Sequence, residues 1–235
     1  MGADVRSLVT VGRVVVTFLI LQAVWTVVRI ASMIGEIGIL TRIRDHGSFT
    51  LAEAAASDQR VQFASRVGVA LFLATAIVWL VWQHRAHANV RAFGVGGLDF
   101  TPGWAVGWWF VPFANLVKPF QTVRELWKAS DPDPGVTGWA TTPTWPVISL
   151  WWATYLAANL IQSAARAGRT APLTADSGIS SDRTSMLGYV ALIVSAFLAV
   201  AVVRGVSARQ VALQVRIPPA PPRPDQPSGR PDEPN

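Results

Sequence analysis

The sequence predicts an all-α fold, namely a polytopic membrane helical bundle with four spans, one broken or re-entrant helix and one amphipathic surface helix. Hydrophobic residues make up 51% of the 235 residues, and the mean hydropathy is +0.36. Charged residues make up only 14%, against roughly 25% in soluble domains. Four apolar segments also reach the roughly 20 residues that a helix needs to cross a bilayer. These observations argue against an ordinary soluble enzyme.

The composition excludes several classes of site. The chain contains no cysteine, which rules out disulfides, a thiolate nucleophile and any Cys-ligated metal centre. Its formal net charge is +6, but the basic residues separate the apolar segments instead of forming one basic stripe. We therefore interpret them as anchors and orientation signals at the membrane surface, and we expect no nucleic-acid partner.

The membrane domain is expected over residues 1–207. Its spans are predicted at about 14–33, 64–81, 146–165 and 185–203. Because the first span follows a short basic N-terminus and has no small-residue cleavage site, we interpret it as a retained anchor and not as a removable signal peptide.

A fifth apolar segment, residues 104–117, is too short to cross the bilayer unaided. It contains Pro112, with Gly103 and Gly107 at its start, so its backbone is not expected to form one regular helix. Irregular backbone at membrane depth must be covered by protein or line a water-filled cavity. The segment is therefore either a re-entrant hairpin or a kinked span that the following residues complete.

The distribution of basic residues favours the re-entrant alternative. If residues 104–117 return to the side from which they enter, then both termini and residues 84–142 share one side of the membrane. That side holds twelve Arg and Lys residues against seven on the other side, with Arg29 inside the first span. Because basic residues concentrate in the cytoplasm, we expect a multi-pass protein of the cell membrane with cytoplasmic N- and C-termini.

Two further segments are expected on the cytoplasmic side. Residues 118–129 are predicted to form an amphipathic helix in the headgroup plane, with Val123 on its apolar face and Arg124 and Lys128 on its polar face. Residues 208–235 are rich in proline and are expected to form a disordered tail with polyproline character. The tail and the surface helix are the candidate docking sites for a protein partner.

Polar and aromatic residues in or beside the spans are further candidates. Arg29 is expected either to reach the outer headgroups or to pair with Trp25 or Glu36. His84 and His87 share a helix face but have no third ligand nearby, so we expect no metal. Most tryptophans fall near predicted span ends, where an interfacial aromatic belt is the usual role.

Residues 82–127 carry the most specific pattern in the chain. A W-x-x-R-A-x-x-N element occupies residues 82–89, and residues 102–119 read P-G-W-A-V-G-W-W-F-x-P-x-x-N-x-x-x-P. Both elements resemble those of a bacterial, mainly actinobacterial, integral membrane family known as domain of unknown function 4328. The resemblance implies a multi-span helical membrane protein, and it supplies no reaction, ligand or catalytic residue.

The polar side chains around the broken helix form the candidate site. They are Arg85, Asn89, Asn115, Lys118, Gln121 and Glu125. They either satisfy backbone groups that the broken helix leaves unpaired or help to coordinate an ion or a lipid headgroup. No nucleophile, acid–base pair or cofactor motif accompanies them, so we expect neither enzyme activity nor a cofactor. The expected function is a non-enzymatic membrane component that lies in the lipid bilayer and engages a protein or lipid partner. The alternative is a small transporter or channel-like protein with its site at residues 104–119.

Overall fold

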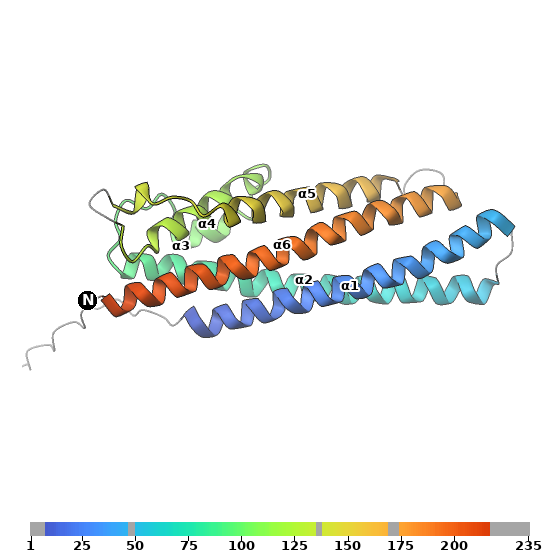
Figure 1. Cartoon of the computed structure of the whole chain (residues 1–235), viewed down its shortest axis with the longest axis horizontal. Helices are drawn as coiled ribbons and strands as arrows, with labels where there is room; N and C mark the ends of the chain where they lie inside the picture. Colours follow the sequence, from blue (N-terminus) through green and yellow to red (C-terminus); the bar gives the residue numbers. More distant parts are fainter. Residues whose placement is uncertain (1–7, 47–49, 135–137, 169–173, 217–235) are drawn as a thin grey trace, which may run out of the picture.

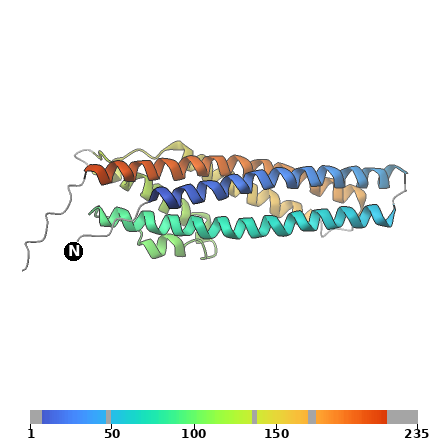
Figure 2. The ribbon, with the colours of Figure 1, turned by 90° about the horizontal axis from the view of Figure 1, so that it is seen from below.

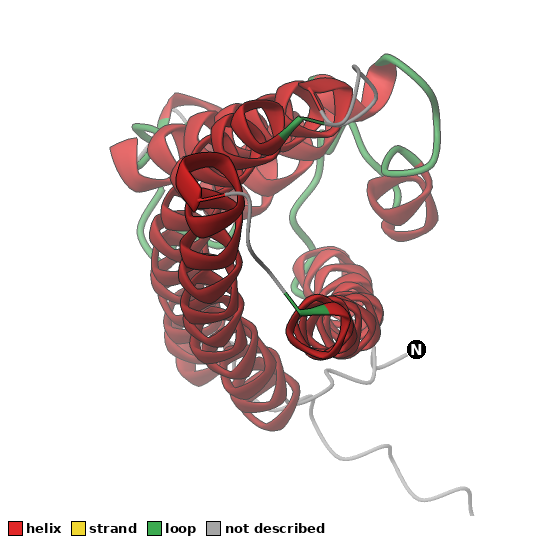
Figure 3. Ribbon diagram, turned by 90° about the vertical axis from the view of Figure 1, so that its right-hand side faces the viewer, coloured by secondary structure: helices red, strands yellow, loops and turns green. Residues whose placement is uncertain are grey.

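A computed structural model describes residues 8–46, 50–134, 138–168 and 174–216, and all regular structure in this part of the chain is helical. Figure 3 shows helices and connecting loops with no strand among these residues. In chain order the elements are α1 (Leu8–His46), α2 (Leu51–Ala92), α3 (Pro102–Gly107), η1 (Ala114–Leu116), α4 (Lys118–Ala129), η2 (Trp139–Thr141), α5 (Pro146–Gly168) and α6 (Ala175–Arg216).

The long helices α1, α2, α5 and α6 run side by side along the longest axis of the molecule (Figure 1, Figure 2). α1 packs against both α2 and α6, and α5 packs against α6, whereas α2 and α5 make little contact with each other. The short helices fit between α2 and α5 at one end, where α3 contacts α2, and α4 contacts α2, α5 and α6. We call residues 93–134 and 138–145 the cap, and this end of the bundle the capped end.

Both ends of the described chain lie at the capped end. α1 and α5 begin there, and α2 and α6 end there (Figure 1). The other termini of these four helices lie together at the far end. The cap therefore connects the end of α2 to the start of α5, at the same end of the bundle where α1 begins and α6 ends.

Three of the helices are longer than the sequence predicts. α1 has 39 residues, and α2 and α6 have 42 residues each. At 1.5 Å per residue each helix is about 60 Å long, roughly twice the hydrocarbon thickness of a bilayer. A capping box explains the early start of α2, since Thr50 and Glu53 each bind the other's backbone N–H with a side-chain oxygen. The apolar spans therefore occupy only the middle part of these helices.

α6 also includes residues that the sequence assigned to the tail. It continues through residues 208–216, and this stretch packs on α2 and the cap. Gln210 is buried and donates to the Ala86 carbonyl oxygen at 2.9 Å and to the Ser130 hydroxyl at 3.1 Å. The rest of the predicted tail, residues 217–235, lies outside the described residues.

By length and composition, α1, α2 and α6 are apolar enough to cross a membrane. α5 has 23 residues, which is also the length of a span, but Tyr155, Asn159 and Gln162 make it more polar than the apolar stretches of the other three. The described residues thus contain three clear candidate spans and a fourth helix of matching length.

Contacts between the long helices place their apolar stretches at the same height. Arg29 of α1 lies 4.5 Å from the centroid of the Tyr189 ring of α6, and a Cβ atom on Gly68 of α2 would lie 3.3 Å from the Arg29 side chain. Gln162 of α5 donates to the Ser185 carbonyl oxygen of α6 at 3.1 Å. Large apolar side chains are exposed along these stretches, as expected for a lipid-facing surface. They include Val24, Val27, Phe72, Ile77, Leu160, Leu187 and Phe197.

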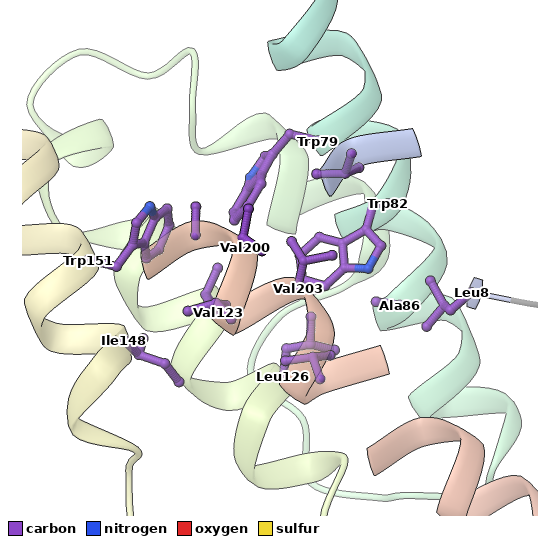
Figure 4. Close-up of a cluster of buried hydrophobic side chains, with 14 of the residues drawn as sticks. Leu8, Trp79, Trp82, Ala86, Val123, Leu126, Ile148, Trp151, Val200 and Val203 are labelled. Atoms are coloured by element: carbon purple, nitrogen blue, oxygen red, sulfur yellow. The ribbon is translucent and has the colours of Figure 1, made fainter. Parts of the chain in front are cut away.

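Tryptophans fill the core near the capped end (Figure 4). Trp79, Trp82, Trp151 and Trp152 are between 0 and 6% exposed, and the Trp79 ring centroid lies 5.2 Å from those of both Trp82 and Trp151. The expectation of an interfacial belt is wrong for these four residues. They lie where α2, α4, α5 and α6 converge, and their large rings fill the space between α2 and α5, which make little contact with each other. Trp104, by contrast, is 55% exposed.

Candidate functional site

Residues 102–117, which we call the hairpin, leave the capped end and return to it (Figure 1). α3 starts after Thr101, whose hydroxyl accepts a hydrogen bond from the Trp104 N–H at 3.2 Å, and Pro102 lies in its first turn. Phe113 adopts a φ of 62°, a left-handed value that residues other than glycine rarely adopt. The chain turns back at this point and continues through η1 into α4.

The tip of the hairpin exposes apolar side chains. Phe110 is 71% and Phe113 is 86% exposed, and Leu116 and Val117 are each 51% exposed. The indole N–H of Trp152 on α5 donates to the Leu116 carbonyl oxygen at 2.9 Å, which holds the tip beside the apolar stretch of α5. The tip therefore continues the exposed apolar surface of the bundle.

Gln83 of α2 holds the cap to the bundle. Its side chain is fully buried, and its amide nitrogen donates to the Ala105 carbonyl oxygen at 3.2 Å and to the Thr122 hydroxyl at 2.8 Å. Its amide oxygen accepts from the indole N–H groups of Trp79 and Trp109 at 3.1 and 2.9 Å. The hydrogen-bonding capacity of the amide is thereby fully used, and one side chain joins α2 to the hairpin and α4.

Glu125 of α4 fixes the loop that leads into the hairpin. Its carboxylate is almost fully buried and accepts from the backbone N–H groups of Asp99 at 2.6 Å and Phe100 at 3.3 Å. Arg91 donates to the Phe100 carbonyl oxygen at 2.9 Å. These bonds orient the loop between α2 and α3 against α4.

A pocket of about 580 Å³ lies between α4, α3 and the loops of the cap. Its volume falls within the range of small-molecule sites, roughly 300–1,000 Å³. The aromatic part of its lining is Phe100, Trp104, Trp108 and Trp139. The polar part of its lining is Asp99, Thr101, Lys118, Gln121, Arg124, Glu125 and Lys128. We call this cavity the cap pocket.

Lys118 has no carboxylate within ion-pair distance among the described residues. Its Nζ lies 5.6 Å from the centroid of the Phe100 ring and 5.5 Å from that of the Trp108 ring. A cation held over aromatic faces keeps its N–H donors available, because the rings attract the charge without accepting strong hydrogen bonds. Lys118 is therefore poised to bind an anion in the cap pocket.

The structure brings together three of the six predicted site residues in the cap pocket, Lys118, Gln121 and Glu125. The other three lie elsewhere. Asn89 is buried and donates to the side-chain oxygen of Gln210 at 3.3 Å, so it joins α2 to α6. Arg85 is half-buried on α2, and Asn115 is exposed in η1.

Part of the cap pocket was missed from the sequence. Lys128 was not among the predicted site residues. It lies on the same face of α4 as Lys118, Gln121 and Glu125, since these four residues are three or four positions apart, and this spacing could have indicated it. Trp139 gave no such signal. It joins the cap pocket because its indole N–H donates to a backbone carbonyl of the loop that follows α2, at 2.8 Å.

Arg29 contacts a residue that the sequence did not indicate. It lies over the Tyr189 ring of α6, while Trp25 donates its indole N–H to the Ala64 carbonyl oxygen at 2.9 Å. The partner that stacks with the guanidinium comes from α6, a helix far away in the sequence. Helical spacing along α1 could therefore not reveal it.

The two histidines of α2 differ in environment. His87 is 2% exposed, and its Nδ1 lies 3.0 Å from the Gln83 carbonyl oxygen, whereas His84 is exposed. Within the described ranges no group of three or more His, Asp or Glu side chains is arranged to hold a metal ion.

Replacing Gln83 by leucine tests the role of the buried amide. Gln83→Leu leaves two indole N–H groups, a hydroxyl and a carbonyl without their partner, and each such loss costs about 1–3 kcal/mol. We expect the variant to unfold at a clearly lower temperature in detergent, as measured by near-UV circular dichroism. His84→Leu, an exposed change on the next residue, should leave the unfolding temperature nearly unchanged. Equal unfolding temperatures for the two variants would contradict this role.

Glu125 gives the capped end a defined pH dependence. Burial raises the pKa of this carboxyl above its ordinary value of 4.5, and the two backbone N–H groups oppose the shift only in part. The folded chain thus binds this proton more tightly than the unfolded chain, so the contribution of Glu125 to stability is fully present below pH 4.5 and declines as the pH rises through the folded pKa. We expect the difference in unfolding free energy between wild type and Glu125→Gln to fall over this range. A difference that stays constant over this range would contradict the raised pKa of Glu125.

The comparisons with known proteins give one match. A family model described as "Domain of unknown function (DUF4328)" matches residues 46–208. The match includes α2, the cap, α5 and most of α6, which are the elements that build and support the cap pocket. No curated protein and no solved structure shows a match. Since more than half of the chain is matched, the protein belongs to this family, domain of unknown function DUF4328.

Proposed function

We propose that this protein is a non-enzymatic component of a bacterial cell membrane, with four spans and cytoplasmic termini, that engages a partner through its cap. The observation that carries the proposal is the cap pocket, in which cations and aromatic rings line a cavity of about 580 Å³ beside an exposed apolar tip. The proline-rich tail is a second candidate contact for a protein partner.

The packing of α5 supports four spans. α5 lies antiparallel along α6, and the contacts with α6 run from Gln162 beside Gly188 to Trp145, the residue just before α5, beside Gly205. These contacts run through the whole apolar stretch of α6, so α5 occupies the same height as a helix that is long and apolar enough to cross a membrane. With α5 as a span, the hairpin enters and leaves the membrane on one side.

The basic residues support the orientation. Arg13, Arg91, Arg204 and Arg209 lie near the ends of the long helices at the capped end, and the cap adds further cations. The far end has fewer basic residues, and Arg42 is paired there with Glu53 at 3.5 Å. By the positive-inside rule the capped end faces the cytoplasm.

The chemistry of the cap pocket supports binding more than catalysis. Glu125 is already bonded to two backbone N–H groups. Among the lining residues the hydroxyl of Thr101 accepts the Trp104 N–H that caps α3, and no bond from it to a base is found among the described residues. Charged donors and aromatic faces that are held in place suit recognition of an anionic ligand.

Labelling of single cysteines tests the topology. The chain has no native cysteine, so each substitution can be labelled alone. Gly96→Cys and Asp133→Cys flank the hairpin, Gln214→Cys is near the end of α6, and Ala52→Cys and Thr174→Cys are at the far end, all at exposed positions. A membrane-impermeant thiol reagent added to intact cells should label only Ala52→Cys and Thr174→Cys. The other three should react only after permeabilisation.

The flanking positions provide the decisive contrast. If Gly96→Cys and Asp133→Cys react from opposite sides of the membrane, the hairpin crosses the bilayer and the proposed cytoplasmic cap does not exist. If all five positions react from outside, the bundle does not span the membrane in the proposed way.

A flux assay separates the proposal from the transporter alternative. The cavity beside Arg29, within the apolar stretches, has a volume of about 10 Å³, room for about one water molecule. We therefore expect proteoliposomes to pass protons, potassium ions and small anions no faster than protein-free liposomes. An added flux that Lys118→Ala abolishes without loss of protein would establish transport instead.

A further inference from the structure

We propose that the cap pocket binds the phosphate-bearing headgroup of an anionic glycerophospholipid, with Lys118, Arg124 and Lys128 as its cationic contacts. The inference rests on the proposed function, and it names the chemistry of the partner at the same site. It draws on three features of the cap pocket, namely its charge, its free donors and its position.

Cations exceed available carboxylates in the cap pocket. Three basic side chains line it, together with the carboxylates of Asp99 and Glu125. Glu125 is committed to two backbone N–H groups of the preceding loop. Lys128 uses one donor on the Ala140 carbonyl oxygen at 3.1 Å and keeps two, and Arg124 is exposed. The cap pocket therefore has a surplus of positive charge that suits an anion.

Free indole donors complement these cations. The indole N–H groups of Trp104 and Trp108 have no acceptor in the described part of the chain, whereas those of Trp109, Trp139 and Trp152 are each bonded to the protein. Trp104 and Trp108 both line the pocket together with Lys118. Phosphate oxygens only accept hydrogen bonds, so ammonium, guanidinium and indole donors around one cavity match a phosphate group.

The position of the cap pocket favours a lipid over a soluble anion. Trp104 and Trp108 line the pocket, and the chain runs directly from them to Phe110 and Phe113 at the apolar tip. A lipid can place its phosphate near Lys118 and its acyl chains along the exposed rings. Inorganic phosphate or a soluble phosphate ester would use only the polar half of this arrangement. Basic pockets on the cytoplasmic side of membrane helices are known to bind anionic headgroups by the same physics.

The test uses the full chain purified in detergent, and ligand binding is read from the rise in thermal unfolding temperature. The probes are short-chain phosphatidylglycerol, short-chain phosphatidylcholine and inorganic phosphate, each titrated separately. Phosphatidylglycerol alone should give a saturable rise. Lys118→Gln and Arg124→Gln should each weaken its apparent affinity by about tenfold, the effect of losing one charge-assisted hydrogen bond. Because Arg124 is exposed, its substitution leaves the fold intact.

A matched control comes from the same end of the bundle. Arg204 is exposed on α6 and does not line the cap pocket, so Arg204→Gln should bind phosphatidylglycerol like the wild type. If this variant loses as much affinity as Arg124→Gln, the lipid binds by general surface charge and the site is wrong.

The three probes distinguish the other ways in which the lipid inference can be wrong. Equal stabilisation by inorganic phosphate would assign the cap pocket to a soluble phosphate compound. Equal stabilisation by phosphatidylcholine would assign it to the apolar tip alone. If no probe stabilises the protein while the labelling places the cap in the cytoplasm, the lipid inference fails, the cap-binding function stands, and its partner is a protein.

Discussion

The buried amide of Gln83 is the interaction on which the cap depends. The hairpin consists of a six-residue helix, an irregular turn and a short 3-10 helix, so it cannot satisfy its backbone or bury its apolar side chains alone. Gln83 binds Ala105, Thr122 and Trp109, which places α3, α4 and the start of the turn relative to α2. In an apolar surrounding an unmade hydrogen bond is costly, and a fully satisfied amide therefore selects one arrangement of these segments.

This arrangement explains why the cap pocket forms at the capped end of the bundle. α2 and α5 barely touch, and the cap fills the space between them with tryptophan rings and the apolar face of α4. Val123 and Leu126 of α4 are almost fully buried in that core. The opposite face of α4 is consequently turned away from α5 and α6, where the loops before α3 and after α4 enclose it. The packing of one helix face thus creates the polar cavity on the other.

The sequence predicted the elements better than their partners. The apolar stretches, the broken segment and the range of α4 follow from hydropathy, Pro112 and helical periodicity, which are local properties. Gln83, Gln210 and Trp139 could not be recognised, because their roles depend on residues that lie 22 to 124 positions away in the chain. The tryptophans misled for a related reason. From the sequence alone, a tryptophan near a span end fits the membrane interface as well as the core between helices, because the helices that pack around it are not known.

The tip of the hairpin connects the fold to the membrane by an energetic argument. A non-glycine residue with a φ of 62° costs about 1–3 kcal/mol, and Phe113 in addition exposes 86% of its surface. In water nothing offsets the backbone strain or the exposure of the Phe113 ring. Against lipid, burying such a ring contributes about 2 kcal/mol, which offsets the strain of the turn. In the topology that we propose, the bilayer would therefore stabilise the hairpin, and the cap pocket lies where this turn meets the cations of α4.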